Sequence, residues 1–337
     1  MPRSAPPGPR ASTSTSADDK GPEGLHLGST PRIVTVTLII LLLLVGVAAA
    51  WLYTPDAARG PLEARWAPPP SQFMGVGGLR LHLRDTGPRH APPVILLHGF
   101  GSSLHAWEDW APALEAGHRM IRLDLPGFGL TGPEPNGDYT DARAHALIVA
   151  LMDRLGLARA DIIGSSMGGR IAWSFAAAHP GRTRKLVLLA PDGFASPGRP
   201  YNQKPRVPML LRILPYTLPD FLLRPSIRPA YAQPDRIPEE TFARYRAMML
   251  APGVRQAIVG RAGMDMLVPP EPLLARITAP TLLLWGSEDA MVPVRNARDY
   301  LRAVPDSRLV VLPGIGHVPM EEAAPASVAA VLAFLRE

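Results

Sequence analysis

Residues 161–169 read Asp-Ile-Ile-Gly-Ser-Ser-Met-Gly-Gly, and this stretch decides the fold. Its first three residues are strand-like, with the apolar pair Ile162 and Ile163, and a helical stretch begins at Met167. A Gly-x-Ser-x-Gly run between a strand and a helix predicts a tight turn that exposes the serine hydroxyl at the helix N-terminus. Ser166 is therefore the candidate nucleophile, and Gly164 and Gly168 are the glycines that such a turn needs.

Short apolar runs alternate with helical stretches on both sides of this turn. The runs that predict buried strands are Val94–Leu97, Met120–Leu123, Asp161–Ile163, Leu186–Leu189, Thr281–Trp285 and Leu309–Leu312. The helical stretches are Asp141–Leu155, Met167–His179 and Glu321–Arg336. Continuous apolar strands between helices are typical of a mostly parallel sheet covered on both faces, entered here through a hairpin near Ser71. We expect an α/β core over residues 71–194 and 273–337.

The interval 195–272 interrupts this alternation. It has no strand-like run, is rich in proline, and contains five methionines, at positions 209, 248, 249, 264 and 266. We predict a largely helical cap inserted over the carboxyl edge of the sheet. Most of the chain's net charge of +6 lies here, because Ala195–Glu271 has 11 basic and 6 acidic residues.

A serine nucleophile needs a base and an acid that orients the base. His317 is the candidate base, because it lies in a glycine-rich loop directly after the last predicted strand. Asp289 follows the strand at 281–285 and is the favoured acid, whereas Asp192 follows the strand at 186–189 and is the second candidate. The order serine, acid, histidine along the chain is the one expected after a nucleophile elbow.

The developing oxyanion needs two backbone N–H donors. The amide of Met167, directly after the nucleophile, is one candidate. The amide of Phe100 is the other, because it lies in the loop His98-Gly99-Phe100-Gly101 after the strand at 94–97, and Gly99 lets the backbone approach a ligand closely.

These motifs together resemble the α/β-hydrolase fold from about residue 73 to the C-terminus. The Ser-Met-Gly-Gly elbow, the cap and an N-terminal apolar segment resemble membrane-anchored monoacylglycerol lipase-like and bacterial lipase or esterase members. The resemblance implies hydrolysis of hydrophobic carboxylic esters through an acyl-Ser166 intermediate. The alternatives are carbon–carbon bond hydrolysis of meta-cleavage products and cofactor-free perhydrolysis on the same triad. The carbon–carbon hydrolases usually have Asn before the serine and Trp after the histidine, whereas Ser165 and Val318 stand here.

Other relatives and classes fit less well. Haloalkane dehalogenases and epoxide hydrolases have an aspartate at the elbow in place of Ser166. Non-enzymatic members of the fold generally lack a triad residue, whereas the three candidates are present here. The chain has no cysteine, no metal-ligand spacing and no basic stripe interleaved with aromatics, so we expect no metal, no cofactor and no nucleic-acid partner.

The N-terminal region predicts a membrane anchor. Residues 1–32 have the composition of a disordered leader, and residues 33–53 begin with 20 uncharged residues, enough for about 30 Å of helix. A Pro-rich linker at 54–70 follows. The alternative is a signal peptide with a cleavage site at Ala48–Ala50. We expect a single-pass protein of the bacterial inner membrane with an exported catalytic domain.

The basic cap adds a second expected contact with lipid. Its arginines are candidates for binding anionic head groups, and they are Arg224, Arg228, Arg244 and Arg246. A lipid-derived ester would then reach the site from the membrane side, along the apolar and methionine-rich residues of the cap.

Overall fold

A computed structural model describes residues 30–195, 200–264 and 266–337. The chain divides into two compact units, residues 1–51 and 52–337. Most of the predicted leader, and the cap residues 196–199 and 265, lie outside the described residues. Helix α1 (Thr30–Leu52) begins three residues before the predicted span. Its segment Arg32–Leu52 is long and apolar enough to cross a membrane, with a mean hydropathy of 2.9, although a signal sequence has the same properties.

The second unit is built on an eight-stranded sheet in the order β1-β2-β4-β3-β5-β6-β7-β8. The strands are β1 Ser71–Val76, β2 Leu79–Thr86, β3 Pro93–Leu97, β4 Arg119–Leu123, β5 Ala160–Ser165, β6 Thr183–Leu189, β7 Thr281–Gly286 and β8 Ser307–Leu312. The hairpin β1–β2 and the pair β2–β4 are antiparallel, and the other pairs are parallel. The predicted mostly parallel sheet is confirmed.

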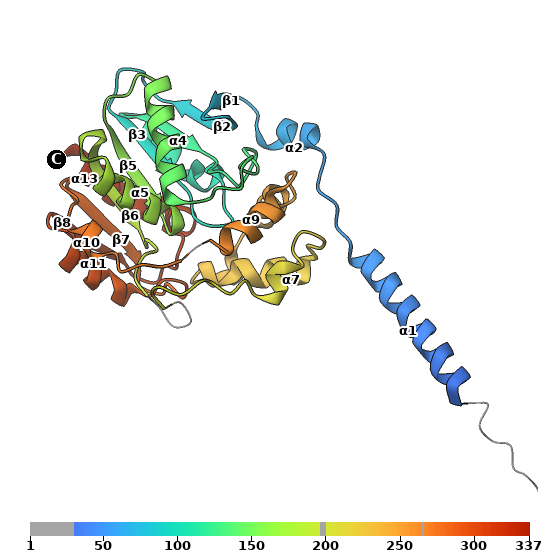
Figure 1. Ribbon diagram of the computed structural model, residues 1–337. Helices are drawn as coiled ribbons and strands as arrows, with labels where there is room; N and C mark the ends of the chain where they lie inside the picture. Colours follow the sequence, from blue (N-terminus) through green and yellow to red (C-terminus); the bar gives the residue numbers. More distant parts are fainter. Residues whose placement is uncertain (1–29, 196–199, 265) are drawn as a thin grey trace, which may run out of the picture. The chain divides into compact units, whose positions relative to one another are not determined.

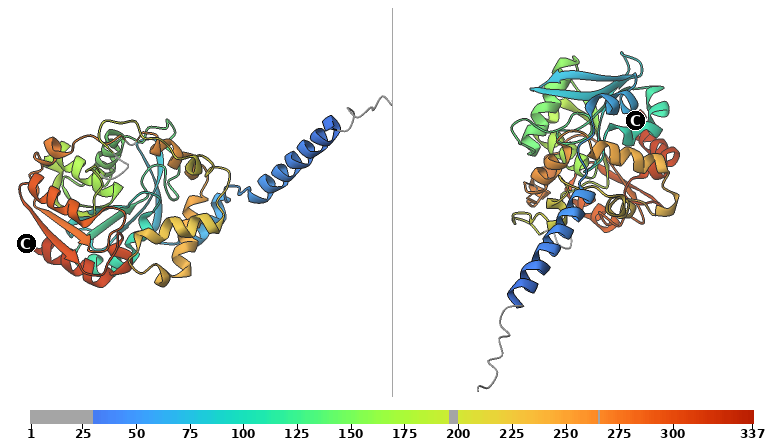
Figure 2. Two further views of the ribbon diagram at one scale, coloured as in Figure 1. Left: turned by 90° about the horizontal axis from the view of Figure 1, so that it is seen from below. Right: turned by 90° about the vertical axis from the view of Figure 1, so that its right-hand side faces the viewer.

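Helices cover both faces of this sheet (Figures 1 and 2). The helices of the core are α3 Ala111–Glu115, α4 Asp141–Arg154, α5 Met167–Ala178, α11 Ala297–Ala303, α12 Pro319–Glu322 and α13 Ala324–Arg336, with the 3₁₀ segment Leu104–Trp110. Strand β3 shows why its sequence is apolar throughout. Val94 and Leu96 pack in one buried cluster with α3 and α13, whereas Ile95 and Leu97 pack in the other with α4 and α5.

The predicted helical cap lies between β6 and β7. Its helices are α6 Met209–Arg212, α7 Asp220–Ile227, α8 Glu239–Met249, α9 Val254–Ala262 and α10 Glu271–Leu274. In Figure 1, α7 and α9 lie together at one side of the sheet. Leu218, Leu223 and Phe242 are buried in the same cluster as α13, so the cap shares a core with the sheet domain.

The segment predicted as a linker at 54–70 has structure of its own. It contains helix α2 (Arg59–Trp66), whose Leu62 is buried in the core. The Asp56 carboxylate forms an ion pair of 2.7 Å with Arg255, which is only 1% exposed. Of the prolines that indicated a linker, Pro61 lies in the first turn of α2 and the others flank this helix. The segment is fixed to the domain by partners far away in the sequence.

Candidate active site

The turn between β5 and α5 has the geometry that the sequence predicted. Ser166 has φ 53° and ψ −117°, a left-handed backbone that a non-glycine residue rarely adopts. A Cβ at Gly164 would lie 2.2 Å from the carbonyl oxygen of Gly168, and one at Gly168 would lie 2.3 Å from that of Leu97. Only glycine fits either position, so the turn can present Ser166 only with this sequence around it.

The structure joins His317 to Asp289. The distance from His317 Nδ1 to Asp289 Oδ2 is 2.7 Å, and both side chains are buried. Asp289 Oδ1 accepts two more hydrogen bonds, from the amides of Met291 at 2.9 Å and Val292 at 2.8 Å. These amides fix the carboxylate in place, so that it holds the imidazole with its proton on Nδ1.

Asp192, the second candidate acid, lies at the elbow. Its amide donates to the carbonyl oxygen of Ser166 at 3.0 Å, and its own carbonyl accepts from the Trp173 indole at 3.0 Å. Among the hydrogen bonds of the described residues, the carboxylate partner of His317 is Asp289. Asp289 is thus the carboxylate that contacts His317, and its role as the orienting acid stays a prediction.

His317 lines the same cavity as Ser166, and its Nε2 is the ring nitrogen that does not contact Asp289. It is buried and has no hydrogen-bond partner among the described residues, although a buried imidazole nitrogen ordinarily has one. Because Nδ1 donates to Asp289, Nε2 is the acceptor nitrogen in the neutral form of the ring. It can accept the hydroxyl proton of a nucleophile that shares the cavity.

His98 fixes the loop that carries Phe100. Leu125 donates its amide hydrogen to His98 Nε2 at 2.9 Å, so Nδ1 carries the proton and donates to the carbonyl of Gly99 at 2.8 Å. Burial lowers the pKa of His98, which keeps the ring neutral. Phe100 is 45% exposed and borders the cavity, whereas the Met167 side chain is buried in the core. The assignment of their amides to the oxyanion remains a prediction.

A buried carboxylate, that of Asp124, lies next to the residue whose amide bonds to His98. Asp124 accepts hydrogen bonds of 2.7 Å from the amides of Leu104 and Leu130 and from His82 Nδ1. Burial alone would raise the pKa of Asp124, but the charge and hydrogen bond of His82, with smaller contributions from His105 and His98, hold it well below its usual range. The sequence analysis did not identify this role of Asp124.

The next histidine in this network, His105, makes stability dependent on pH. Burial lowers its pKa from 6.5 to about 4, and its Nε2–H donates to the carbonyl of Trp66 at 2.7 Å. The unfolded chain therefore takes up a proton below pH 6.5 that the folded chain refuses until about pH 4. We expect the contribution of His105 to the free energy of unfolding to be complete above pH 6.5. As the pH drops toward 4, the free energy of unfolding should fall by about 2–3 kcal/mol because of this group.

Urea titrations across this pH range test the expectation, with His105→Gln as the matched variant that cannot be charged. The variant should lose part of the pH slope. His98, His118 and His145 also have pKa values lowered by burial, so a residual slope of the same sign should remain. An identical slope in both proteins would show that His105 does not contribute.

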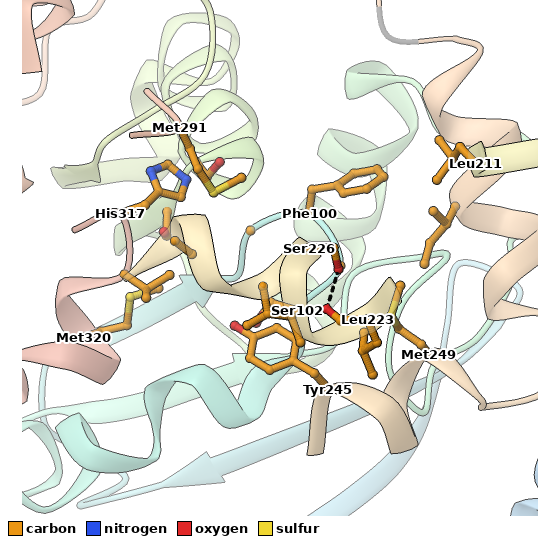
Figure 3. Close-up of a pocket in the computed structure, with 18 residues that line it drawn as sticks. Phe100, Ser102, Leu211, Leu223, Ser226, Tyr245, Met249, Met291, His317 and Met320 are labelled. Atoms are coloured by element: carbon orange, nitrogen blue, oxygen red, sulfur yellow. Dashed lines mark hydrogen bonds between the residues drawn. The ribbon is translucent and has the colours of Figure 1, made fainter. Parts of the chain in front are cut away.

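The cavity itself is apolar. It has a volume of about 250 Å³ and is lined by Gly99, Phe100, Gly101, Ser102, Ser165, Ser166, Leu211, Leu223, Ser226, Ile227, Ala230, Tyr245, Met249, Ile258, Met291, His317, Val318 and Met320. None of these residues is Asp, Glu, Lys or Arg. In Figure 3, His317 and Met291 lie at one end, and Leu211 and Met249 lie toward the other.

The four cap arginines do not form the free basic surface that the sequence suggested. Arg244 is largely buried and pairs with Glu321 at 2.6 Å, close to the His317 loop. The other three pair with carboxylates on the cap itself: Arg224 with Glu239, Arg228 with Asp235 and Arg246 with Asp220. Each cation thus has an anionic partner, which sequence spacing did not reveal because the partners are 7 to 77 residues away.

Glu321 is a residue that the sequence analysis missed. Besides Arg244, it accepts hydrogen bonds from Tyr231 at 2.6 Å and Tyr245 at 3.2 Å. Burial and the negative charge of Glu321 raise the pKa of both tyrosines, so they stay protonated donors. Only its position four residues after His317 could have pointed to this link between the cap and the histidine loop.

The fold and the site define a hydrolase of the α/β class, with a serine at the strand–helix elbow and a buried His–Asp pair beside it. The model of the alpha/beta hydrolase fold family matches residues 92–324, and this chain belongs to that family.

Curated relatives and solved structures extend over most of the chain. It is 30% identical over 272 residues to a 2-hydroxy-6-oxo-6-phenylhexa-2,4-dienoate hydrolase of Burkholderia cepacia, which covers 77% of this chain and 93% of that protein. Among solved structures, it resembles a membrane phospholipase A with a TM-score of 0.67 and 25% identity, over 90% of this chain and 98% of that one. It also resembles a 2-hydroxy-6-oxo-6-phenylhexa-2,4-dienoate hydrolase from Rhodococcus with a TM-score of 0.67 and 25% identity, over 79% and 98%.

Proposed function

We propose that this chain is a serine hydrolase that cleaves carboxylic esters with hydrophobic acyl groups. The observation that carries the proposal is the cavity shared by Ser166 and His317, whose lining includes no Asp, Glu, Lys or Arg. Such a lining suits a neutral acyl chain, because burying apolar surface is favourable and burying an unpaired charge is costly.

The reaction follows from the position of each group. Ser166 Oγ attacks the ester carbonyl carbon while its proton passes to His317 Nε2, and Asp289 stabilises the imidazolium. The amides of Phe100 and Met167 stabilise the oxyanion. His317 then returns the proton to the departing alkoxide, which leaves as the alcohol. Water attacks the acyl-Ser166 carbonyl with His317 as base, which releases the carboxylic acid and restores the serine.

Carbon–carbon bond hydrolysis is the second candidate, favoured by the names of the curated relatives. A dienoate substrate carries a carboxylate, and a buried carboxylate needs a cation or several N–H donors. No Lys or Arg lines the cavity, and Arg224, Arg228 and Arg246 pair with carboxylates outside it. The uncharged lining therefore supports the ester over the dienoate.

A direct comparison of the two substrate classes tests the proposal. We expect kcat/KM for p-nitrophenyl esters with acyl chains of intermediate or long length to exceed that for 2-hydroxy-6-oxo-6-phenylhexa-2,4-dienoate by about 100-fold or more. The full-length chain in detergent is the enzyme, and the Ser166→Ala variant gives the background rate for each substrate. Faster turnover of the dienoate would make the carbon–carbon hydrolase the correct function.

We also propose that α1 anchors the enzyme in the bacterial inner membrane and that the catalytic unit is exported. The likeness to the membrane phospholipase A supports the anchor. Its 90% coverage corresponds to about 303 residues, more than the 286 residues from Leu52 to Glu337, so the likeness includes part of the N-terminal unit. Carbonate extraction of membranes, with protease access from either side, tests both parts.

A further inference from the structure

The chain that leaves the apolar helix is hydrogen-bonded to the cap at once. The carbonyl oxygen of Leu52, the last residue of α1, accepts from Thr217 Oγ1 at 2.7 Å. The amide of Thr54 donates to the carbonyl of Tyr216 at 2.9 Å, and the amide of Leu218 donates to Thr54 Oγ1 at 3.2 Å. We call residues 52–66 the strap; its contacts with the cap lie within the second unit.

A second group of contacts holds the strap further along. The Asp56 carboxylate pairs with the buried Arg255 and accepts from the amide of Gly253 at 2.9 Å. The amide of Ala57 donates to the carbonyl of Leu250 at 2.8 Å. The bond of Ala57 joins main chain to main chain, and the Asp56 carboxylate neutralises the buried charge of Arg255. The strap is therefore a fixed part of the cap. The cap must therefore stay beside the point where the apolar helix ends.

The segment of the cap that is bonded to the strap, residues 209–221, exposes large apolar side chains. Their exposed fractions are 74% for Met209, 59% for Leu210, 41% for Ile213, 65% for Tyr216 and 62% for Phe221. We call these five residues the apolar face. Tyr216 belongs both to this face and, through its main chain, to the contact with the strap. Exposed apolar residues gathered in one segment are typical of a protein or membrane interface.

A groove lies beside the catalytic cavity and includes residues of the apolar face. It has a volume of about 300 Å³ and is lined by Pro208, Leu210, Leu211, Ile213, Leu214, Thr217, Leu218, Pro219, Leu222, Leu223, Ser226 and Met249. Leu211, Leu223, Ser226 and Met249 also line the catalytic cavity. In Figure 3, Leu211 and Met249 lie at the end away from His317. The groove is thus lined by Leu210 and Ile213 of the apolar face and adjoins the cavity that contains Ser166.

We propose that the apolar face rests in the surface of the lipid bilayer and that the groove admits the acyl chain of a membrane lipid to Ser166. The second half rests on the proposed ester hydrolysis. The occupant is lipid because the face and the strap belong to one unit, and the strap continues directly from a 21-residue apolar segment of bilayer length. Contact through apolar side chains requires no anionic lipid, and Arg224, Arg228, Arg244 and Arg246 are paired within the protein. Docking on neutral lipid is therefore insensitive to salt.

The absence of cysteine from the natural sequence makes the test direct. Full-length Phe221→Cys is labelled with an environment-sensitive fluorophore and reconstituted in phosphatidylcholine vesicles. The emission maximum of the label should shift to shorter wavelength, and its intensity should fall when the lipids carry nitroxide groups. The matched control is Asp306→Cys, an exposed position before β8, which should do neither. Raising the salt concentration should leave both results unchanged.

A label at position 221 that behaves like the one at 306 would overturn the proposal. The proposal would also fail if the emission of the label at 221 shifted with rising protein concentration in detergent, while nitroxide lipids in vesicles did not quench it. The occupant of the apolar face would then be a second copy of the chain. These readouts do not depend on activity, so failure of the ester hypothesis remains distinguishable from failure of membrane docking.

The groove is tested by activity. Phe221 lines neither the groove nor the catalytic cavity. Phe221→Asp should lower kcat/KM for a long-chain lipid ester in vesicles by about tenfold, and it should leave hydrolysis of soluble p-nitrophenyl butyrate in detergent within about twofold. Equal loss on both substrates would contradict entry from the bilayer, whereas absence of Ser166-dependent turnover of either ester would contradict the proposed function.

Discussion

Replacing Ser166 with alanine should lower kcat for ester hydrolysis by about 10⁴-fold or more, because no acyl-enzyme can form without the hydroxyl. Ser166 has a left-handed backbone, and the close contacts at Gly164 and Gly168 leave no room for a Cβ at either position. Both features serve to expose the hydroxyl of Ser166. Release of p-nitrophenol from medium-chain esters by the full-length protein is the measurement. KM should change much less than kcat, because the hydroxyl acts mainly in the transition state.

A distant serine provides the control for this experiment. Ser307 lies at the start of β8, and its hydroxyl donates to the carbonyl of Val304 at 2.8 Å. Ser307→Ala should leave kcat within about twofold, since a surface substitution of this kind changes stability only slightly. Retention of more than about one-tenth of the activity by a well-folded Ser166→Ala protein would mean that another group is the nucleophile.

The core and the elbow could be predicted because their signals are local. A strand buried on both faces must be apolar at every position, as β3 is, and such runs stand out between helices. The elbow is equally local, since Gly164 and Gly168 lie next to the strained Ser166. Each signal lies within a few residues of the structure that it specifies.

The choice of the acid could be predicted only as a preference. Asp192 and Asp289 follow neighbouring parallel strands, β6 and β7, so strand order alone places both near the elbow. The decision depends on the path of the loop that carries His317. A Cβ at Gly286 would lie 2.2 Å from the carbonyl of Gly316, so the histidine loop passes directly over the end of β7.

The strap and the paired arginines could not be read from the sequence, because their partners are distant in the chain. Asp56 and Arg255 are 199 residues apart, and Arg244 and Glu321 are 77 apart. The prolines of residues 54–70 indicated a linker because the sequence does not show the distant partners of the other residues in this segment, such as Arg255 for Asp56. A count of cap charges likewise indicates a basic surface, because the count does not show which carboxylate pairs with each arginine.

Replacing Asp289 with asparagine should lower kcat by about 10³–10⁴-fold, with little change in the fold. The amide of asparagine can offer a donor to Nδ1, which would move the imidazole proton to Nε2 and leave no acceptor for the serine hydroxyl. The amides of Met291 and Val292 would still hold the side-chain oxygen, so the position of the residue should persist.

Asp192→Asn is the matched substitution, because Asp192 follows the neighbouring strand and its amide contacts the carbonyl of Ser166. Its kcat should stay within about threefold of the natural protein, since the carboxylate bonded to His317 is Asp289. Thermal unfolding of both variants separates a loss of chemistry from a loss of structure. A collapse of kcat in Asp192→Asn with activity retained in Asp289→Asn would transfer the role to Asp192. Such a result would also require the His317 ring to leave the position in which Asp289 holds it.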